Sequence, residues 1–158
     1  MRMRRKKNLD KHLDECGVYY TELIEGTLDL RVEEENLLNI EEMFGRNAPI
    51  LLEIGCGKGR FAVEFAKANP DINLLAVEKD ANVIVSACEL AIAEGVKNLR
   101  FMRCSAEYLE RYLKPQSIER LFLNFSCPFP KNKYASHRLT AANFLVIYKR
   151  ILNRDAEI

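Results

Sequence analysis

Hydrophobic positions follow two different patterns along the chain, and the change comes near residue 49. Before it, apolar residues recur at helical spacing, first at Leu9, Leu13, Tyr20, Leu23 and Ile24, and then at Leu37, Leu38, Ile40, Met43 and Phe44. This spacing predicts two amphipathic helices, and Gly45 is placed to end the second. We therefore treat residues 1–48 as an N-terminal helical extension and residues 49–158 as the main domain.

From residue 50 onward, short apolar runs alternate with helical patterns. The predicted strands are 50–54, 73–78, 98–103 and 120–125, and the predicted helices are 61–69, 80–94, 106–113 and 139–152. Asp80 is a suitable N-cap, and Gly95 a suitable stop, for the second of these helices. The alternation indicates an α/β fold with a doubly wound, mostly parallel sheet and helices on both faces. Ligands of such sheets bind beyond the carboxyl ends of the strands.

Composition narrows the class of protein. The chain has 158 residues, of which 48% are hydrophobic and 30% charged, as expected for one soluble globular domain. No apolar run approaches the roughly 20 residues that span a bilayer, and no apolar segment follows the basic start as it would in a signal peptide. We therefore expect a cytoplasmic protein without a membrane partner.

The cysteines and histidines argue against a metal site. The five cysteines form no Cys-x-x-Cys pair, and the two histidines, His12 and His137, are far apart in the sequence. This pattern is typical of free thiols in a reducing compartment. We expect no bound metal ion.

The net charge of +1 conceals an uneven distribution. Residues 2–11 hold six bases and one acid, residues 25–42 hold seven acids and one base, and residues 128–158 hold six bases and two acids. Separated basic segments can mark a polyanionic partner. Ordinary solvated surface is the alternative for each segment.

A glycine-rich loop, Glu53-Ile-Gly-Cys-Gly-Lys-Gly59, follows the first predicted strand of the main domain. Glycines there allow a tight turn and close approach of a ligand to the backbone. Glu53 would repel a dinucleotide pyrophosphate but suits the amino group of S-adenosylmethionine. Glu78 ends the next strand, where a ribose-binding carboxylate belongs. Together these acids favour S-adenosylmethionine over NAD, and a buried turn with incidental acids is the alternative.

Ser105 follows the third of these strands, at the place that normally flanks an adenine ring. Its hydroxyl could bond the base, or it could simply cap the next helix; the sequence leaves both open.

The segment Asn124-Phe-Ser-Cys-Pro-Phe-Pro-Lys131 follows the fourth strand, and its prolines stiffen the backbone. Phe125 and Phe129 could stack on a base, although core packing is the stronger alternative for Phe125. Lys131, Lys133 and Arg138 add positive charge, which suits an extruded nucleotide. A nucleophilic pair of Cys127 and His137 is also conceivable.

A set of short motifs carries a resemblance to a known family. They are Arg2-Met3-Arg4, Glu53 to Gly59, Asn69-Pro-Asp-Ile-Asn73, Glu78, Asn124-Phe-Ser126, Pro128, Pro130-Lys131 and Arg138-Leu-Thr140. On these residues the chain resembles the bacterial tRNA (guanine-N7)-methyltransferase (TrmB) family over most of its length from Pro49 onward.

The resemblance implies a Rossmann-like methyltransferase that carries a methyl group from S-adenosyl-L-methionine to N7 of guanosine-46 in the tRNA variable loop. S-adenosyl-L-homocysteine would be the product. We assign cofactor binding to Glu53, Gly55, Gly57, Gly59, Glu78, Ser105, Ala106 and Asn124. We assign substrate binding to Cys127, Phe129, Lys131, Lys133 and Arg138, with Cys127 at the catalytic position.

Three departures from the family pattern bear on catalysis. The family usually has Asp-Pro-Trp-Pro where this chain has Cys127-Pro-Phe-Pro130, and an acid where it has Ser105. The basic run is also thinner at 132, 134 and 137. Because guanine N7 carries a lone pair and no proton, no base is needed, and positioning can carry much of the reaction. We expect activity to depend on cofactor placement and base orientation.

Other functions remain open. They are a methyltransferase of the same fold with another substrate, an S-adenosylmethionine- or RNA-binding homologue with weak or no catalysis, and an NAD-dependent oxidoreductase. Family members continue through three further strands, whereas this chain ends where we expect the fifth strand to begin, at Ala156. We therefore expect a C-terminally truncated chain, monomeric or weakly dimeric, with strand 120–125 at an exposed edge. Alone, it should be less stable than its size suggests, and inactive.

Overall fold

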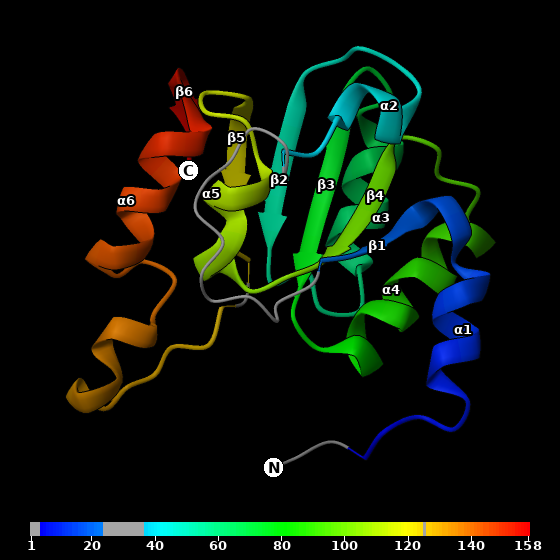
Figure 1. The fold of residues 1–158 in the computed structure, drawn as a ribbon, viewed down its shortest axis with the longest axis horizontal. Coiled ribbons are helices and arrows are strands. Elements are labelled where there is room, and N and C mark those ends of the chain that lie inside the picture. Colours follow the sequence, from blue (N-terminus) through cyan, green and yellow to red (C-terminus); the bar gives the residue numbers. More distant parts are fainter. Residues whose placement is uncertain (1–3, 24–36, 125) are drawn as a thin grey trace.

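A six-stranded parallel sheet forms the centre of the computed structural model, which describes residues 4–23, 37–124 and 126–158 (Figure 1). The strands are β1 (Tyr20–Glu22), β2 (Ile50–Ile54), β3 (Asn73–Glu78), β4 (Leu99–Arg103), β5 (Ile118–Phe122) and β6 (Leu152–Glu157), in the order β1-β4-β3-β2-β5-β6. The chain runs outward from β2 through β3 to β4 and then returns to β5, on the other side of β2. This reversal places a ligand crevice at the carboxyl ends of β2 and β5.

Helices cover both faces of the sheet (Figure 1). One face packs against α1 (Leu9–Glu15), α3 (Arg60–Ala68) and α4 (Ala81–Ala93), and the other against α2 (Ile40–Phe44), α5 (Leu109–Tyr112) and α6 (Ala142–Ile151). The strands supply both cores because successive side chains point to opposite faces: Leu74 and Ala76 lie in the first core, Leu75 and Val77 in the second. In the described ranges, no helix is long and apolar enough to cross a membrane.

The α/β fold predicted from the sequence is confirmed, and several elements match closely. The predicted strands 50–54 and 73–78 are β2 and β3, residue for residue. Helix α3 ends just before Pro70. The Asp80 carboxylate accepts a hydrogen bond from the backbone N–H of Asn82 at 2.8 Å and so caps α4 as expected. Gly45 and Gly95 take φ values of 68° and 63° at the ends of α2 and α4.

The prediction of one long helix through Leu9 and Leu23 is wrong. Helix α1 ends at Glu15, a 3-10 turn follows over Gly17–Tyr19, and Tyr20 begins β1, which pairs with β4. Gly17 has a φ of 53°, which an α-helix cannot accommodate, and aromatic residues after it favour a strand. Ile24 lies outside the described residues.

The C-terminal elements also differ from the prediction. Strand β5 begins at Ile118 and ends at Phe122, and α6 begins at Ala142 and ends at Ile151. Strand β6 then begins at Leu152 rather than Ala156, and it pairs with β5. The predicted strand 120–125 is therefore not at the sheet edge; β1 and β6 are the two edges.

Candidate functional site

A cavity of about 540 Å³ opens at the carboxyl ends of β2 and β3, where the topology predicts a ligand site. Four loops and the start of α6 build its wall. The residues that line it are Glu53, Ile54, Gly55, Cys56, Gly57, Lys58, Arg60, Phe61, Val77, Glu78, Lys79, Cys104, Ser105, Ala106, Glu107, Ser126, Cys127, Phe129, His137, Leu139 and Phe144. The structure thus brings together eight of the predicted site residues: Glu53, Gly55, Gly57, Glu78, Ser105, Ala106, Cys127 and Phe129.

The glycine loop is held against the end of β3. The backbone N–H groups of Gly55 and Cys56 both donate to the carbonyl of Val77, at 2.8 and 3.0 Å. Gly55 and Gly57 have φ values of 76° and 57°, a region that side chains disfavour. The sharp turn that results exposes backbone along one wall of the cavity.

Glu78 connects the glycine loop to the loop that follows β3 through hydrogen bonds. Its carboxylate accepts hydrogen bonds from the backbone N–H of Gly57 at 3.2 Å, of Lys79 at 2.9 Å and of Asp80 at 3.1 Å. The half-buried carboxylate therefore has a fixed orientation at the cavity wall. An oxygen held in this way can still accept a hydrogen bond from a ligand hydroxyl.

Glu53 is the buried acid of the cavity. The residue is only 1% exposed, and Oε1 accepts a long hydrogen bond from the Asn124 amide at 3.4 Å. Among the residues that the structure describes, Oε2 has no hydrogen-bond partner. Burial raises the pKa of this carboxyl to about 7, against which the Asn124 hydrogen bond acts weakly. An orphaned buried carboxylate oxygen is costly unless a ligand supplies a donor or a positive charge. This atom therefore fits a cationic group in the cavity.

Two predicted cofactor residues lie behind the cavity wall rather than on it. Asn124 reaches the cavity through its hydrogen bond to Glu53. Gly59 begins α3 in direct contact with α4, since a Cβ there would lie 2.7 Å from the Cβ of Ala87. Ser105 stands at the N-cap position before Ala106, but its side chain makes no capping hydrogen bond. Ser105 is one of the residues that line the cavity.

Three rings form the outer part of the site. The ring of Phe129 lies 6.5 Å from that of Tyr134 and 5.9 Å from that of His137. The Phe129 backbone has a φ of 41°, and its carbonyl accepts two hydrogen bonds from the Arg138 guanidinium at 3.1 and 3.0 Å. Arg138 therefore holds the strained loop in place, and the exposed thiol of Cys127 lies on the same wall of the cavity.

The predicted cationic residues surround the site without lining it. Lys131 and Lys133 are exposed, and the Lys133 ammonium lies 4.9 Å from the centre of the Tyr134 ring. Phe125, a possible stacking residue, lies outside the described residues. Cys127 and His137 share the cavity, but the described residues include no hydrogen bond between them, as a nucleophilic pair would need.

Sequence reasoning missed several lining residues, including Phe61, Lys79 and Phe144. Lys79 directly follows Glu78, which the sequence identifies as a ligand-binding acid. Its position just after a strand end could therefore have predicted that it lines the cavity. Phe144 comes from α6, whose approach to the glycine loop only the folded chain reveals. Among the described residues, no group of three or more His, Cys, Asp or Glu side chains is arranged to hold a metal ion.

Comparison with known proteins gives one family match and many related sequences. The family described as "Putative methyltransferase" matches residues 47–158. A tRNA (guanine-N(7)-)-methyltransferase of Bacillus cytotoxicus is 44% identical over 125 residues, which are 79% of this chain and 58% of that protein. The protein of the same name from Macrococcus caseolyticus is 42% identical over 120 residues, 76% of this chain and 57% of that protein. The chain thus spans little more than half the length of these relatives.

Solved structures share the fold at low sequence identity. The antibiotic-resistance methyltransferase Kmr has a TM-score of 0.56 and 24% identity, over 73% of this chain and 59% of its own. Phosphoethanolamine N-methyltransferase 2 of Haemonchus contortus, solved with S-adenosylhomocysteine, has a TM-score of 0.53 and 21% identity, over 75% of this chain and 25% of its own. Both likenesses confirm the predicted methyltransferase fold.

Proposed function

Because the chain belongs to the methyltransferase family whose pattern covers residues 47–158, we propose that it transfers a methyl group from S-adenosyl-L-methionine to N7 of a guanine in tRNA. The named relatives, at 42–44% identity, support this substrate. The observation that carries the proposal is the cavity itself, which is lined both by Glu53 and Glu78 beside the glycine loop and by Cys127 and Phe129 from the segment after β5. Within tRNA, we propose guanosine-46 of the variable loop as the target.

The residues of the cavity fit this cofactor. Oε2 of Glu53, which has no hydrogen-bond partner among the described residues, is suited to the cofactor's ammonium group, and the fixed carboxylate of Glu78 is suited to its ribose hydroxyls. Gly55 and Gly57 leave space for it against the backbone, and Ser105 and Ala106 line the side on which an adenine would lie. Asn124 acts through Glu53, and Gly59 acts through the packing of α3. When bound, S-adenosylmethionine supplies an electrophilic methyl group on its sulfonium.

The remaining residues orient the base and the RNA. Phe129 offers an aromatic face to a guanine, with an energy of about 1–3 kcal/mol for a stacked base. Arg138 fixes the carbonyl of Phe129 and keeps further N–H groups for a phosphate. Exposed Lys131 and Lys133 contact phosphates by charge, without reading sequence. Cys127 lies at the catalytic position but cannot supply the negative charge of an aspartate.

The proposal is tested by incubating the protein with labelled S-adenosylmethionine and an unmodified tRNA transcript. We expect N7-methylguanosine, mapped to its position by chemical cleavage of the RNA at that base. Calorimetry on the same preparation compares S-adenosylmethionine with NAD and should detect only the former. Absence of methyl transfer to N7 under conditions in which a relative is active would overturn the proposed activity.

A second candidate function is binding of cofactor and RNA without turnover. Cys127 favours it, because a cysteine stands where the resemblance places an aspartate. In that case the calorimetry would show normal cofactor binding, while the tRNA would stay unmodified.

A further inference from the structure

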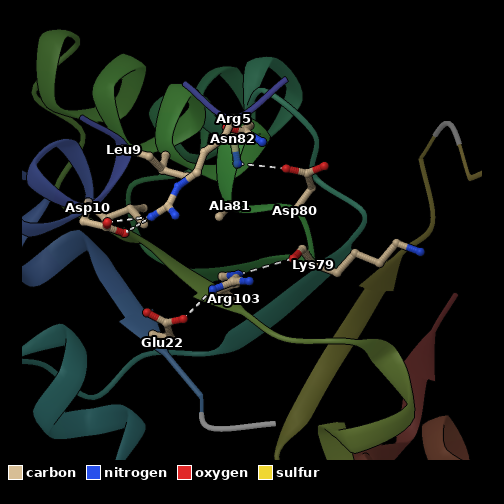
Figure 2. A pocket seen from close by; sticks show the side chains of 10 residues that line it. Arg5, Leu9, Asp10, Glu22, Lys79, Asp80, Ala81, Asn82 and Arg103 are labelled. Carbon is tan, nitrogen blue, oxygen red and sulfur yellow. Dashed lines mark hydrogen bonds and ion pairs between the residues drawn. The ribbon is translucent and has the colours of Figure 1, made fainter. Parts of the chain in front are cut away.

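A second cavity, of about 560 Å³, lies beside the candidate cofactor site at the carboxyl ends of β1, β3 and β4 (Figure 2). It is lined by Arg5, Leu9, Asp10 and Leu13 near α1, by Glu22 from β1, by Lys79, Ala81, Asn82 and Asp80 between β3 and α4, and by Arg103 from β4. Lys79 also lines the candidate cofactor site. The two cavities therefore share a wall.

Among the described residues that line this second cavity, three basic side chains accompany three acidic ones, and the side chains of both ion pairs are partly or largely exposed. The Arg5 guanidinium pairs with the Asp10 carboxylate at 2.5 Å, and the two side chains are 66% and 81% exposed. Arg103 pairs with Glu22 and also donates to the carbonyl of Lys79 at 3.4 Å (Figure 2). Exposed ion pairs contribute little to stability, typically about 0–1 kcal/mol. A ligand can therefore exchange them for its own contacts at small cost.

Donor and acceptor side chains both line the cavity, together with the apolar residues Leu9, Leu13 and Ala81. This arrangement suits a nucleobase. A guanidinium such as that of Arg103 donates to ring nitrogen and carbonyl oxygen, and a carboxylate such as that of Glu22 accepts from amino groups. The cavity also has room for a nucleotide.

Lys79 adds a cation to the second cavity. Within the described part of the chain, its ammonium forms no ion pair with a carboxylate, and Figure 2 shows the side chain extending away from the other labelled residues. A compact, mobile ammonium is suited to a phosphate. Its place on the wall shared by the cavities would put this phosphate between them.

We propose that the second cavity binds a further nucleotide of the same RNA whose guanine enters the candidate cofactor site. This inference rests on the proposed function. Strand β4 lies three strand positions from β5, beyond which Cys127 lies, a span of about 14 Å at the usual strand spacing. A few nucleotides of single-stranded or looped RNA bridge that span. The substrate is thus a polynucleotide that binds both at the candidate cofactor site and at the second cavity.

The test compares two double variants with the unmodified protein. Arg5→Gln with Lys79→Gln removes two cations of the cavity, while Lys97→Gln with Lys114→Gln removes two exposed lysines near the opposite ends of the strands. Affinity for an unmodified tRNA transcript is measured without cofactor at several salt concentrations. We expect the first pair to bind about tenfold more weakly, with a salt dependence reduced by about one contact for each cation lost. The control pair should lose less than about threefold.

A second measurement separates base recognition from charge alone. The RNA carries photoactivatable uridines, and crosslinked peptides are identified by mass spectrometry. Crosslinks to residues 79–82 or 9–13 support the proposal, whereas equal RNA affinity in the two double variants, or crosslinks confined to residues 126–138, overturns it. Neither measurement requires turnover, so failure of methyl transfer by the unmodified protein would count against the proposed function and not against this cavity.

Discussion

Glu53 shows how burial changes the properties of a single residue in the candidate site. Burial raises the pKa of its carboxyl group from the ordinary 4.5 to about 7, and within the described part of the chain one of its oxygens has no hydrogen-bond partner. The folded protein therefore binds a proton more tightly here than the unfolded chain does. Between pH 4.5 and about 7 the unfolded state releases this proton first, so the contribution of this group to stability falls as pH rises, and the loss is complete above pH 7.

Glu53→Gln should remove this pH dependence. A pKa difference of 2.5 corresponds to about 3 kcal/mol. From pH 5 to pH 8 the unmodified protein should lose about that much free energy of unfolding, and the variant should not. The difference between the variant and the unmodified protein therefore rises by about the same amount. Urea denaturation at several pH values measures it. Affinity for S-adenosylmethionine should fall more than tenfold. The exposed Glu64→Gln serves as control, and superimposable pH profiles for Glu53→Gln and the unmodified protein would contradict the assigned burial.

Cys127 is the residue at which the proposed methyl transfer can be tested by adding a negative charge. Methylation at N7 leaves a positive charge on the guanine ring, which a nearby carboxylate stabilises. Because the side chain is exposed, Cys127→Asp carries little desolvation cost. We expect kcat for methyl transfer to rise about tenfold or more, with cofactor affinity changed less than threefold. Cys127→Asn has the same shape without the charge, and an equal gain from both variants would rule out the electrostatic explanation.

At the scale of elements, the packing of α3 against α4 depends on one glycine. Gly59 has a φ of 78°, and a Cβ there would lie 2.7 Å from the Cβ of Ala87 and 3.0 Å from its Cα. The obstacle is helix backbone, which cannot move aside cheaply. The glycine therefore lets the loop approach α4, and this approach sets the position of the turn that lines the cavity.

Gly59→Ala should destabilise the protein by about 2–5 kcal/mol, the sum of a left-handed backbone penalty and overpacking. Gly95→Ala is a matched control, because its φ of 63° is similar but nothing lies within 4 Å of the new Cβ. It should cost only about 1–2 kcal/mol. Midpoints of urea denaturation compare the two, and equal losses would show that contact with α4 is unimportant.

The edge strands show where local pattern fails to predict an element. Leu152 continues the apolar spacing of Tyr148 and Ile151, so the sequence favours helix through it. In the structure, Leu152 pairs instead with Ile118 of β5. Strand β1 also depends on a distant strand. It has only three residues, and β4 supplies its hydrogen-bond partners. Pairing with a strand distant in sequence determines where β6 begins and why β1 forms.

At the scale of the whole molecule, cations from two separate basic segments of the sequence come to lie around one end of the sheet, while Lys149 and Arg150 of the second segment lie at the end of α6, near the start of β5. Arg5 lies beside the second cavity, while Lys131 and Lys133 follow β5 at the far side of the candidate cofactor site. Both groups lie at the carboxyl side of the strands. A net charge of +1 is thus compatible with a polyanionic substrate, because the distribution of charge matters more than its sum.

The sequence by itself determined the features that depend on neighbours along the chain. Strands β2 and β3, the turn of the glycine loop and the cap of α4 at Asp80 follow from alternation, glycine and capping chemistry over a few residues. It also placed the acids Glu53 and Glu78 at strand ends, since parallel strands share one ligand-binding edge.

Only the tertiary structure decided the burial, the pKa and the contacts of these residues. The raised pKa of Glu53 comes from burial, and the long hydrogen bond from Asn124, 71 residues away in sequence, opposes it only weakly. Tertiary contacts also placed Lys79 between two cavities and committed part of the Arg138 guanidinium to the Phe129 carbonyl. Burial, strand pairing and cavity shape depend on groups far apart in the chain. A local pattern carries no information about which of those groups meet.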